Sequence, residues 1–164
     1  MARVSILTCS DKGAAGERSD ESGDTIERLA LEAGHEVVRR DVVADDENLI
    51  AARLRAWADD THCDIILTTG GTGLTARDVT PEATLQVAER EMPGIGVALI
   101  ANGLRYTPRA ALTRGVAVTR GRTLIVNLPG SPKAVAQGMD VLVPLLSHIA
   151  ELLQGPVEHT RGEG

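Results

Sequence analysis

Aromatic side chains are almost absent from this chain of 164 residues, which has no Phe, one Trp (Trp57) and one Tyr (Tyr106). The core must therefore be built from Val, Leu, Ile and Ala. Proteins that bind single-stranded nucleic acid without sequence preference stack successive bases on several aromatic rings. Two rings cannot form such a platform, so the composition argues against this class of function.

Cysteine and histidine are also scarce. Cys9 and Cys63 form neither a C-x-x-C pair nor a zinc-binding spacing, and the four histidines include no H-x-x-x-H pair. These spacings argue against a zinc site. We interpret the two cysteines as small buried residues of a protein in a reducing cytosol. A nucleophilic Cys9 is the alternative, although no neighbour in the sequence would activate its thiol.

No apolar run approaches the length of a membrane span, and the chain begins with a strand-like segment where a signal peptide would stand. The net charge is -6 and the isoelectric point is about 5.2. Acidic proteins are poor nonspecific ligands for nucleic acids and anionic membranes. We therefore expect a cytoplasmic protein whose partners are neither nucleic acid nor membrane. A small anionic ligand is compatible with this charge, because a metal ion or a few arginines can offset the local field.

Segments typical of strands alternate with segments typical of helices. Strands are predicted at residues 3–8, 36–43, 64–69, 115–119 and 123–127, and the last two would form a hairpin. Helices are predicted at residues 23–33, 80–92, 95–104 and 132–153. A further helix is expected to be capped by Asp45 or Asp46 and to end near residue 58. This alternation predicts a single three-layer α/β/α domain over residues 1–154 with a mostly parallel, mixed sheet. Residues 10–22 are expected to form a long loop, and residues 155–164 a polar C-terminal tail.

The glycine-rich run Thr68–Pro81 is the most informative segment. Gly70, Gly71 and Gly73 would let the backbone approach a ligand closely and present its N–H groups, and Thr72 adds a hydroxyl. The run lacks the Lys-Ser/Thr of a P-loop and the G-x-G-x-x-G spacing of a dinucleotide fold. Two interpretations remain open from the residues alone: a loop for a phosphorylated ligand, and a strand-to-helix turn that needs glycine for its angles.

Acidic residues follow two of the predicted strands. Asp78 lies just before Thr80, which is the expected N-cap of the next helix, so Asp78 has no evident capping role. Asp45 and Asp46 follow the second strand, where helix capping explains them well. The carboxyl ends of parallel strands share one edge of a sheet, where ligands bind. Asp45 and Asp78 at that edge would suit Mg²⁺ and a polyphosphate, and capping is the alternative for Asp45.

Two motifs resemble the signature of the MogA/MoaB family of molybdenum-cofactor biosynthesis proteins. They are Thr68–Gly94 (T-T-G-G-T-G-L-T-A-R-D-V-T-P-E-A-T-L-Q-V-A-E-R-E-M-P-G) and Ile125–Lys133 (I-V-N-L-P-G-S-P-K). Val43–Asp46 is similar to the V-x-D-[DE] that the family carries after its second strand. The resemblance covers almost the whole domain, and the form R-D-V-T-P-E-A-T is closer to the MogA branch than to MoaB.

The resemblance implies molybdopterin adenylyltransferase activity, in which Mg-dependent transfer of AMP from ATP to the terminal phosphate of molybdopterin releases pyrophosphate. It implies catalytic and metal-binding roles for Asp45 and Asp78. Nucleotide and pterin contacts are implied for Ser10, Gly70, Gly71, Thr72, Gly73, Asn127, Pro129, Gly130 and Ser131. A homotrimer, and a molybdenum-insertion protein that receives the product, are implied as partners.

One position departs from the family pattern. Gly103 stands where family members often have Ser, which removes one polar contact toward the pterin or the phosphate. Three other functions remain as alternatives: a MoaB-like paralogue that binds molybdopterin with little or no turnover, a pterin-binding scaffold, and a nucleotide pyrophosphatase that hydrolyses nucleotide without pterin.

Overall fold

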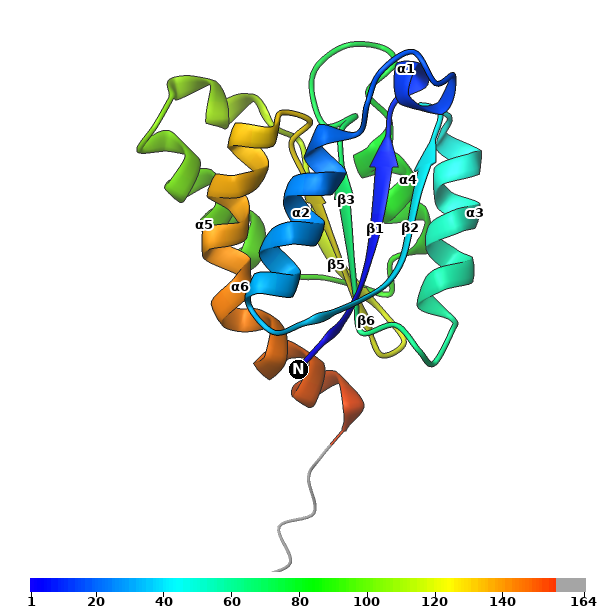
Figure 1. Cartoon of the computed structure of the whole chain (residues 1–164), viewed down its shortest axis with the longest axis vertical. Coiled ribbons are helices and arrows are strands. Elements are labelled where there is room, and N and C mark those ends of the chain that lie inside the picture. Colours follow the sequence, from blue (N-terminus) through cyan, green and yellow to red (C-terminus); the bar gives the residue numbers. More distant parts are fainter. Residues whose placement is uncertain (156–164) are drawn as a thin grey trace, which may run out of the picture.

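Six strands form one sheet in the order β2-β1-β3-β6-β5-β4 in the computed structural model, which describes residues 1–155 (Figure 1). The strands are β1 (Arg3–Cys9), β2 (Glu36–Val43), β3 (Ile65–Thr69), β4 (Arg90–Glu91), β5 (Ala117–Arg120) and β6 (Thr123–Leu128). β2, β1, β3 and β6 run parallel, whereas β5 is antiparallel to both β6 and β4. The predicted mostly parallel, mixed sheet with its hairpin is thus confirmed. The predicted tail lies outside the described residues except for Gly155.

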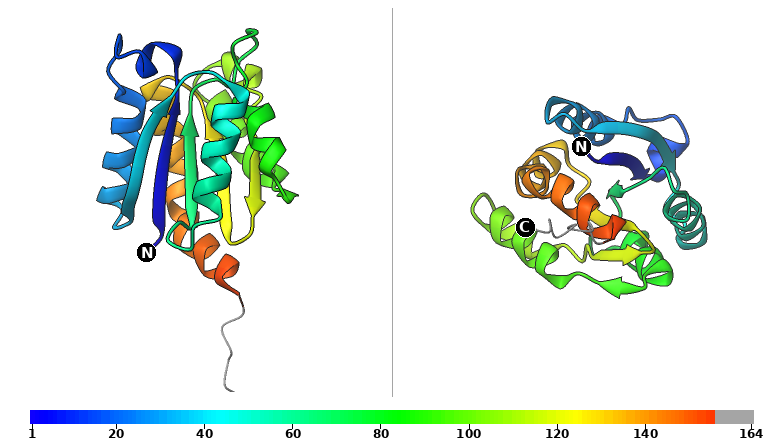
Figure 2. Two further views of the ribbon diagram at one scale, coloured as in Figure 1. Left: turned by 90° about the vertical axis from the view of Figure 1, so that its right-hand side faces the viewer. Right: turned by 90° about the horizontal axis from the view of Figure 1, so that it is seen from below.

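Helices cover both faces of the sheet (Figures 1 and 2). One face carries α2 (Glu21–Glu32), α5 (Pro93–Leu104) and α6 (Pro132–Gln154), and the other carries α3 (Glu47–Ala58) and α4 (Thr80–Val87). A short helix, α1 (Asp11–Ala14), follows β1, and a 3₁₀ turn, η1 (Pro108–Leu112), follows α5. The three-layer prediction is confirmed. Among the described helices, none combines the length and the apolar character that a bilayer crossing requires.

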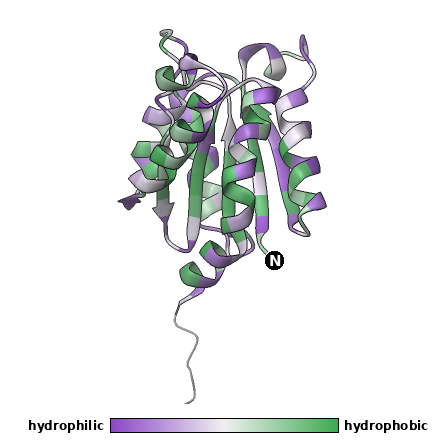
Figure 3. Ribbon diagram, turned by 90° about the vertical axis from the view of Figure 1, so that its left-hand side faces the viewer, coloured by the Kyte–Doolittle hydropathy of each residue, from purple (hydrophilic) through white to green (hydrophobic). Residues whose placement is uncertain are grey.

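Alternating strand residues build two aliphatic cores. In β3, Ile65 and Leu67 pack under α2 and α6, whereas Ile66 packs under α3 and α4, as the period of two requires. Hydrophobic residues accordingly predominate in the interior strands β3 and β6, whereas the edge strands β2 and β4 also carry charged residues (Figure 3). Trp57 belongs to the second core, and the guanidinium groups of Arg39 and Arg53 each lie 5.8 Å from its ring centroid.

Three predicted boundaries were wrong. Residues 10–22 are not one loop, because α1 lies within them and α2 begins at Glu21, where the Asp20 carboxylate caps the helix by accepting from the Gly23 N–H at 3.0 Å. The helix from Thr80 ends at Val87 and not at residue 92, because residues 90–91 pair with β5. Helix α5 begins at Pro93, two residues before the predicted start.

Candidate functional site

Four loops meet where the parallel strands end, at the top of the sheet in Figure 1. Two backbone hydrogen bonds hold neighbouring loops together. The Ser10 N–H donates to the Val43 carbonyl at 2.8 Å, and the Gly70 N–H donates to the Leu128 carbonyl at 3.2 Å. The loops that follow β1, β2, β3 and β6 therefore form one surface, as the sequence predicted.

The glycine loop after β3 folds tightly onto its own helix. Gly70 and Gly71 have φ values of +92° and +68°, which side chains disfavour. The Thr80 hydroxyl donates to the Gly70 carbonyl at 2.9 Å. The buried side chain of Thr80 therefore closes the loop and does not cap the helix. Thr80 is the first residue of α4, and the N-cap is Val79, whose side chain makes no capping hydrogen bond. The prediction that Thr80 is the N-cap was wrong.

Arg114 holds the far half of this loop. Its guanidinium donates to the carbonyl oxygens of Gly73 and Asp78, both at 2.7 Å, and pairs with the Glu82 carboxylate. Its backbone N–H also donates to the Thr72 carbonyl at 2.8 Å. Arg114 therefore fixes the backbone that the glycines leave conformationally free.

Asp45 points one carboxylate oxygen into the site without a partner. Its Oδ2 accepts from the Asp11 N–H at 3.0 Å, and the Asp11 carboxylate in turn accepts from the Asp45 N–H at 3.0 Å. Its Oδ1 is buried and has no hydrogen-bond partner within the described part of the chain. Asp46, not Asp45, caps α3, since its carboxylate accepts from the Leu49 N–H at 2.9 Å. The capping alternative for Asp45 is therefore wrong.

The charge state of Asp45 reflects this position. Burial raises the pKa of its carboxyl group, and the negative charges of Asp11 and Asp78 raise it further. The hydrogen bond from the Asp11 N–H and the positive charge of Arg77 act in the opposite direction on Asp45. Arg77 also donates to the Asp11 carboxylate at 2.8 and 3.0 Å, which lowers the pKa of Asp11. A cation placed at Asp45 Oδ1 would give this oxygen a partner and would offset the repulsion between Asp45 and the carboxylates of Asp11 and Asp78.

Asp78 occupies a turn of its own loop. Its carboxylate accepts from the Thr75 N–H at 2.9 Å and from the Thr75 hydroxyl at 2.8 Å. It therefore has a local structural role that the sequence did not reveal. Its charge still reaches Asp45, whose pKa it helps to raise.

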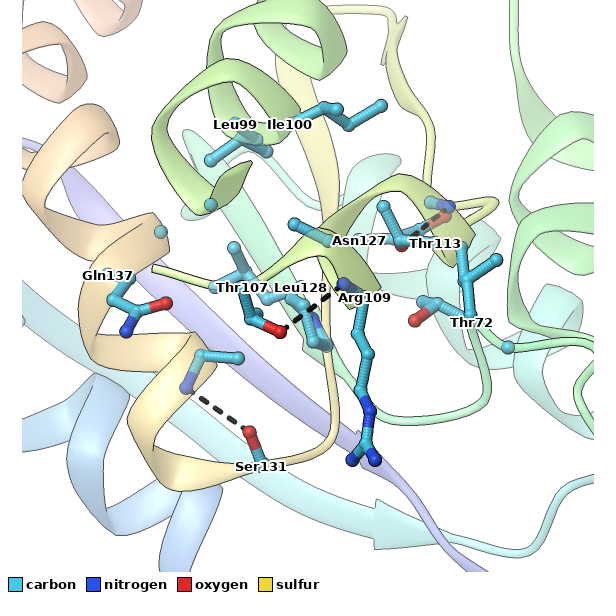
Figure 4. Close-up of a pocket in the computed structure, with 18 of the residues that line it drawn as sticks. Thr72, Leu99, Ile100, Thr107, Arg109, Thr113, Asn127, Leu128, Ser131 and Gln137 are labelled. Atoms are coloured by element: carbon cyan, nitrogen blue, oxygen red, sulfur yellow. Dashed lines mark hydrogen bonds between the residues drawn. The ribbon is translucent and has the colours of Figure 1, made fainter. Parts of the chain in front are cut away.

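Two cavities open beside the loops. The polar cavity, of about 660 Å³, is lined by Ser10, Asp45, Gly70, Gly71, Gly130 and Ser131, together with Arg18, Asp20 and Ser22. The apolar cavity, of about 510 Å³, lies under α5 and η1 and is lined by Thr72, Gly73, Asn127, Pro129 and Ser131, with Leu99 and Ile100 among its apolar residues (Figure 4). Ser131 lines both. Every residue predicted to form the site lines one of the two cavities, except Asp78.

Known proteins share this architecture. A family described as "Probable molybdopterin binding domain" matches residues 5–148. The chain belongs to this family. It is 35% identical to the molybdopterin adenylyltransferase of Helicobacter pylori J99 over 154 residues, which cover 93% of this chain and 88% of that protein. It is 36% identical to the molybdopterin adenylyltransferase of Escherichia coli K12 over 176 residues, which cover 98% of this chain and 90% of that protein. The resemblance inferred from the motifs is confirmed.

Solved structures agree with the family assignment. The molybdopterin biosynthesis enzyme MoaB of Thermus thermophilus superposes with a TM-score of 0.88 at 48% identity, covering 95% of this chain and 98% of that one. The Mog protein of Mycobacterium ulcerans superposes with a TM-score of 0.86 at 37% identity, covering 93% and 99%.

Asn127 is the family motif residue whose geometry differs most from the expectation of a ligand contact. Its side-chain amide is buried, donates to the hydroxyls of Thr68 and Thr84 at 3.0 and 2.9 Å, and accepts from the Val116 N–H at 3.1 Å. These bonds use both N–H donors and one acceptor position of the amide, so Asn127 joins β6 to β3 and α4 beneath the loops.

The surroundings of Cys9 are those of a structural cysteine. It is buried, and burial raises the pKa of its thiol to about 12. Only the thiolate attacks, so the burial and the raised pKa argue against a reactive Cys9. The interpretation of both cysteines as buried residues is confirmed, since Cys63 is also free and buried.

Proposed function

We propose that this chain is a molybdopterin adenylyltransferase. The observation that carries the proposal is the buried, unpartnered Oδ1 of Asp45 beside a glycine loop, in a cavity that adjoins a second, apolar one at Ser131. Relatives that are 35% and 36% identical over most of their length are named molybdopterin adenylyltransferases. A two-substrate reaction needs two adjoining sites, and the pair of cavities supplies them.

The two cavities differ in the substrate that they suit. The apolar cavity, with Leu99 and Ile100 on one wall, suits the flat pterin ring of molybdopterin. The polar cavity, with Gly70 and Gly71 on its floor, suits the polyphosphate of ATP. An oxygen of the terminal phosphate of molybdopterin then attacks the α-phosphorus of ATP, the bond from that phosphorus to the β-phosphate oxygen breaks, and pyrophosphate leaves. The attacking phosphate is already anionic, so positioning and charge neutralisation suffice.

Asp45 is the residue that fits Mg²⁺. No group of three or more His, Cys, Asp or Glu residues within positions 1–155 could hold a metal ion by itself. Mg²⁺ typically takes one or two carboxylates together with phosphate oxygens, which matches the free Oδ1 of Asp45. The ion would supply neutralisation of the phosphate charge when bound. We assign Asp78 a supporting role, through its negative charge near Asp45.

The deciding experiment mixes purified protein with molybdopterin, ATP and Mg²⁺ and measures adenylyl-molybdopterin and pyrophosphate. Formation of both, dependent on pterin and Mg²⁺, supports the proposal. Nucleotide hydrolysis without pterin would identify a pyrophosphatase. A second candidate function is favoured by the 48% identity to a protein called MoaB: a paralogue that binds molybdopterin with little or no turnover. Tight pterin binding without product would identify it.

We expect Asp78→Asn to lower the rate of adenylyl transfer by about 10²-fold or more, because the substitution removes the negative charge near Asp45. The protein should remain folded, because the Asn side chain keeps an oxygen that can accept from the Thr75 N–H. The matched control is Thr75→Val, which removes the hydroxyl contact and keeps the charge. It should change the rate by less than about tenfold. Steady-state kinetics decide this. An equal loss in both variants would reduce Asp78 to a residue that shapes its loop.

We also propose a homotrimer, supported by the composition of α5. Asn102 is its only polar side chain, yet Ile95 is its only buried residue. Gly96, Leu99, Ile100 and Gly103 face the apolar cavity at the spacing of one helix face. The other face leaves Val97 67% exposed and Leu104 49% exposed. A helix that is apolar on both faces fits an interface between copies.

Val97→Arg should therefore convert the assembly to monomers, because a charged side chain would be buried in an apolar contact. Light scattering coupled to size-exclusion chromatography measures the mass. The control is Leu49→Arg, which replaces a residue that is 54% exposed on α3 at the other face of the sheet. A wild-type monomer, or a Val97→Arg protein of unchanged mass, would contradict the assignment.

Two further elements complete the proposal. The free, buried Cys9 and Cys63 support a cytoplasmic location, where thiols stay reduced. A molybdenum-insertion protein would receive the adenylylated product. In support, the relative called molybdenum cofactor synthesis protein cinnamon, from Drosophila melanogaster, matches 95% of this chain at 39% identity, but the match spans only 26% of that protein. That relative is therefore much longer than this chain.

A further inference from the structure

Arg109 is the single charged residue among those that line the apolar cavity (Figure 4). It lies in η1, where its backbone N–H donates to the Thr107 hydroxyl at 3.3 Å. Within residues 1–155 its guanidinium makes no hydrogen bond or ion pair. The neighbouring arginines differ, because Arg105 contacts the Asn102 side chain and Arg114 holds the glycine loop. A cation without a protein partner at an apolar cavity is available to an anionic ligand.

The direction of the side chain indicates which part of a ligand it would meet. Figure 4 shows Arg109 extending from η1 to the side of the cavity where Ser131 lies. Ser131 is also the residue that the apolar and polar cavities share. It is the N-cap of α6, a helix of 23 residues, and the amino end of a helix favours negative charge. The guanidinium thus lies toward the junction of the cavities and away from the wall formed by Leu99.

Gly103 accounts for the position of η1. A Cβ at this residue would lie 2.8 Å from the Ala110 Cβ, so α5 and η1 pack more closely than a side chain at position 103 allows. Ala110 follows Arg109 directly, so this close contact sets where η1, and with it the guanidinium, lies over the cavity. The glycine that departs from the family pattern therefore has a physical reason in this chain.

We propose that Arg109 binds the terminal phosphate of the phosphorylated pterin substrate, and that Gly103 positions η1 for that contact. The identity of the ligand depends on the proposed function. The ring of a pterin needs no cation, whereas a phosphate is recognised well by the planar, doubly donating guanidinium group. Arg109 would hold the attacking phosphate at the entrance to the polar cavity, where ATP is placed.

The test compares wild type, Arg109→Ala and Arg109→Lys in two measurements: molybdopterin binding without ATP or Mg²⁺, followed by fluorescence, and steady-state adenylyl transfer. Arg109→Ala should raise both the Kd and the KM for molybdopterin roughly tenfold to a hundredfold, and leave the KM for ATP unchanged. Lys should restore part of the loss. Arg105→Ala is the matched control and should behave as wild type. Molybdopterin affinity that is unchanged in Arg109→Ala would overturn the inference.

The binding arm separates this inference from the proposed function. Wild type that binds molybdopterin through Arg109 but forms no adenylylated product supports the inference and refutes the transferase. A wild-type protein that binds no molybdopterin overturns both. For Gly103, the variant Gly103→Ser should weaken molybdopterin binding, and the double variant Gly103→Ser/Ala110→Gly should restore it. A Gly103→Ser protein with unchanged or tighter binding would overturn the positioning role.

Discussion

Asp45→Asn is expected to reduce kcat/KM for adenylyl transfer by roughly 10³-fold, because a metal contact contributes several kcal/mol and each ~1.36 kcal/mol is a factor of ten. The amide keeps the shape of the carboxylate but is a much poorer ligand for a hard cation than the buried, unpartnered Oδ1. Steady-state rates at several Mg²⁺ concentrations measure the effect. Near-normal turnover at saturating Mg²⁺ would remove Asp45 from the proposed metal site.

The same substitution should not cost stability at neutral pH. The pKa of Asp45 is raised in the folded protein, chiefly by burial, so the folded state favours the protonated form. That contribution to stability is fully present below the unfolded pKa of about 3.9 and is lost as the pH rises through the folded value. Asn carries no charge at any of these pH values. The free energy of unfolding of Asp45→Asn should therefore equal or exceed that of wild type at pH 7, with the difference shrinking toward pH 4, as equilibrium denaturation would show.

Asp46 provides the matched control, since it is adjacent and carries the same functional group. Its carboxylate caps α3, a role that Asn fills about equally well, so Asp46→Asn should keep both activity and stability. Asp46→Ala should lose about 0.5–2 kcal/mol of stability and stay active. An inactive Asp46→Asn beside an active Asp45→Asn would reverse the assignment of the two residues.

The architecture was predictable from the sequence because the signals for it are local. Short apolar runs and glycine-rich strand ends specify strands such as Ile65–Thr69, and the parallel sheet then places four loops at one edge. The motif residues of those loops follow from the same signals. Ten of the eleven predicted site residues line a cavity for this reason, with Asp78 as the exception.

The features of the fold and the site that could not be predicted depend on contacts between residues far apart in the sequence. Arg114 reaches Gly73 across 41 positions, and Asp11 reaches Asp45 across 34. No spacing in the sequence distinguishes such residues from surface charges. The error at residues 90–91 has the same origin, since pairing with β5 overrides the local helix preference. Asp78 shows the reverse case: its bond to Thr75, three positions away, is a turn signal that was present in the sequence and was missed.

Gly70→Ala is expected to give the largest loss of stability among single-methyl substitutions in the loops of this site. Two costs add. A φ of +92° disfavours any side chain, by about 1–2 kcal/mol. A Cβ at Gly70 would also clash with the Cys9 carbonyl oxygen, and because this atom belongs to the backbone of the interior strand β1, the loop must move away from it. Overpacking of this kind costs about 1–3 kcal/mol more.

Gly34→Ala separates these two costs. Gly34 has a φ of +82°, close to that of Gly70, but nothing lies within 4 Å of its added Cβ. The difference in the free energy of unfolding between the two variants, measured by chemical denaturation, therefore reports the close approach alone. We expect Gly70→Ala to be the less stable by about 1–3 kcal/mol. Because the Gly70 N–H is bonded to Leu128, its displacement should also disturb the loop after β6 and lower affinity for both substrates. Equal stabilities would mean that this glycine serves only the angle of the turn.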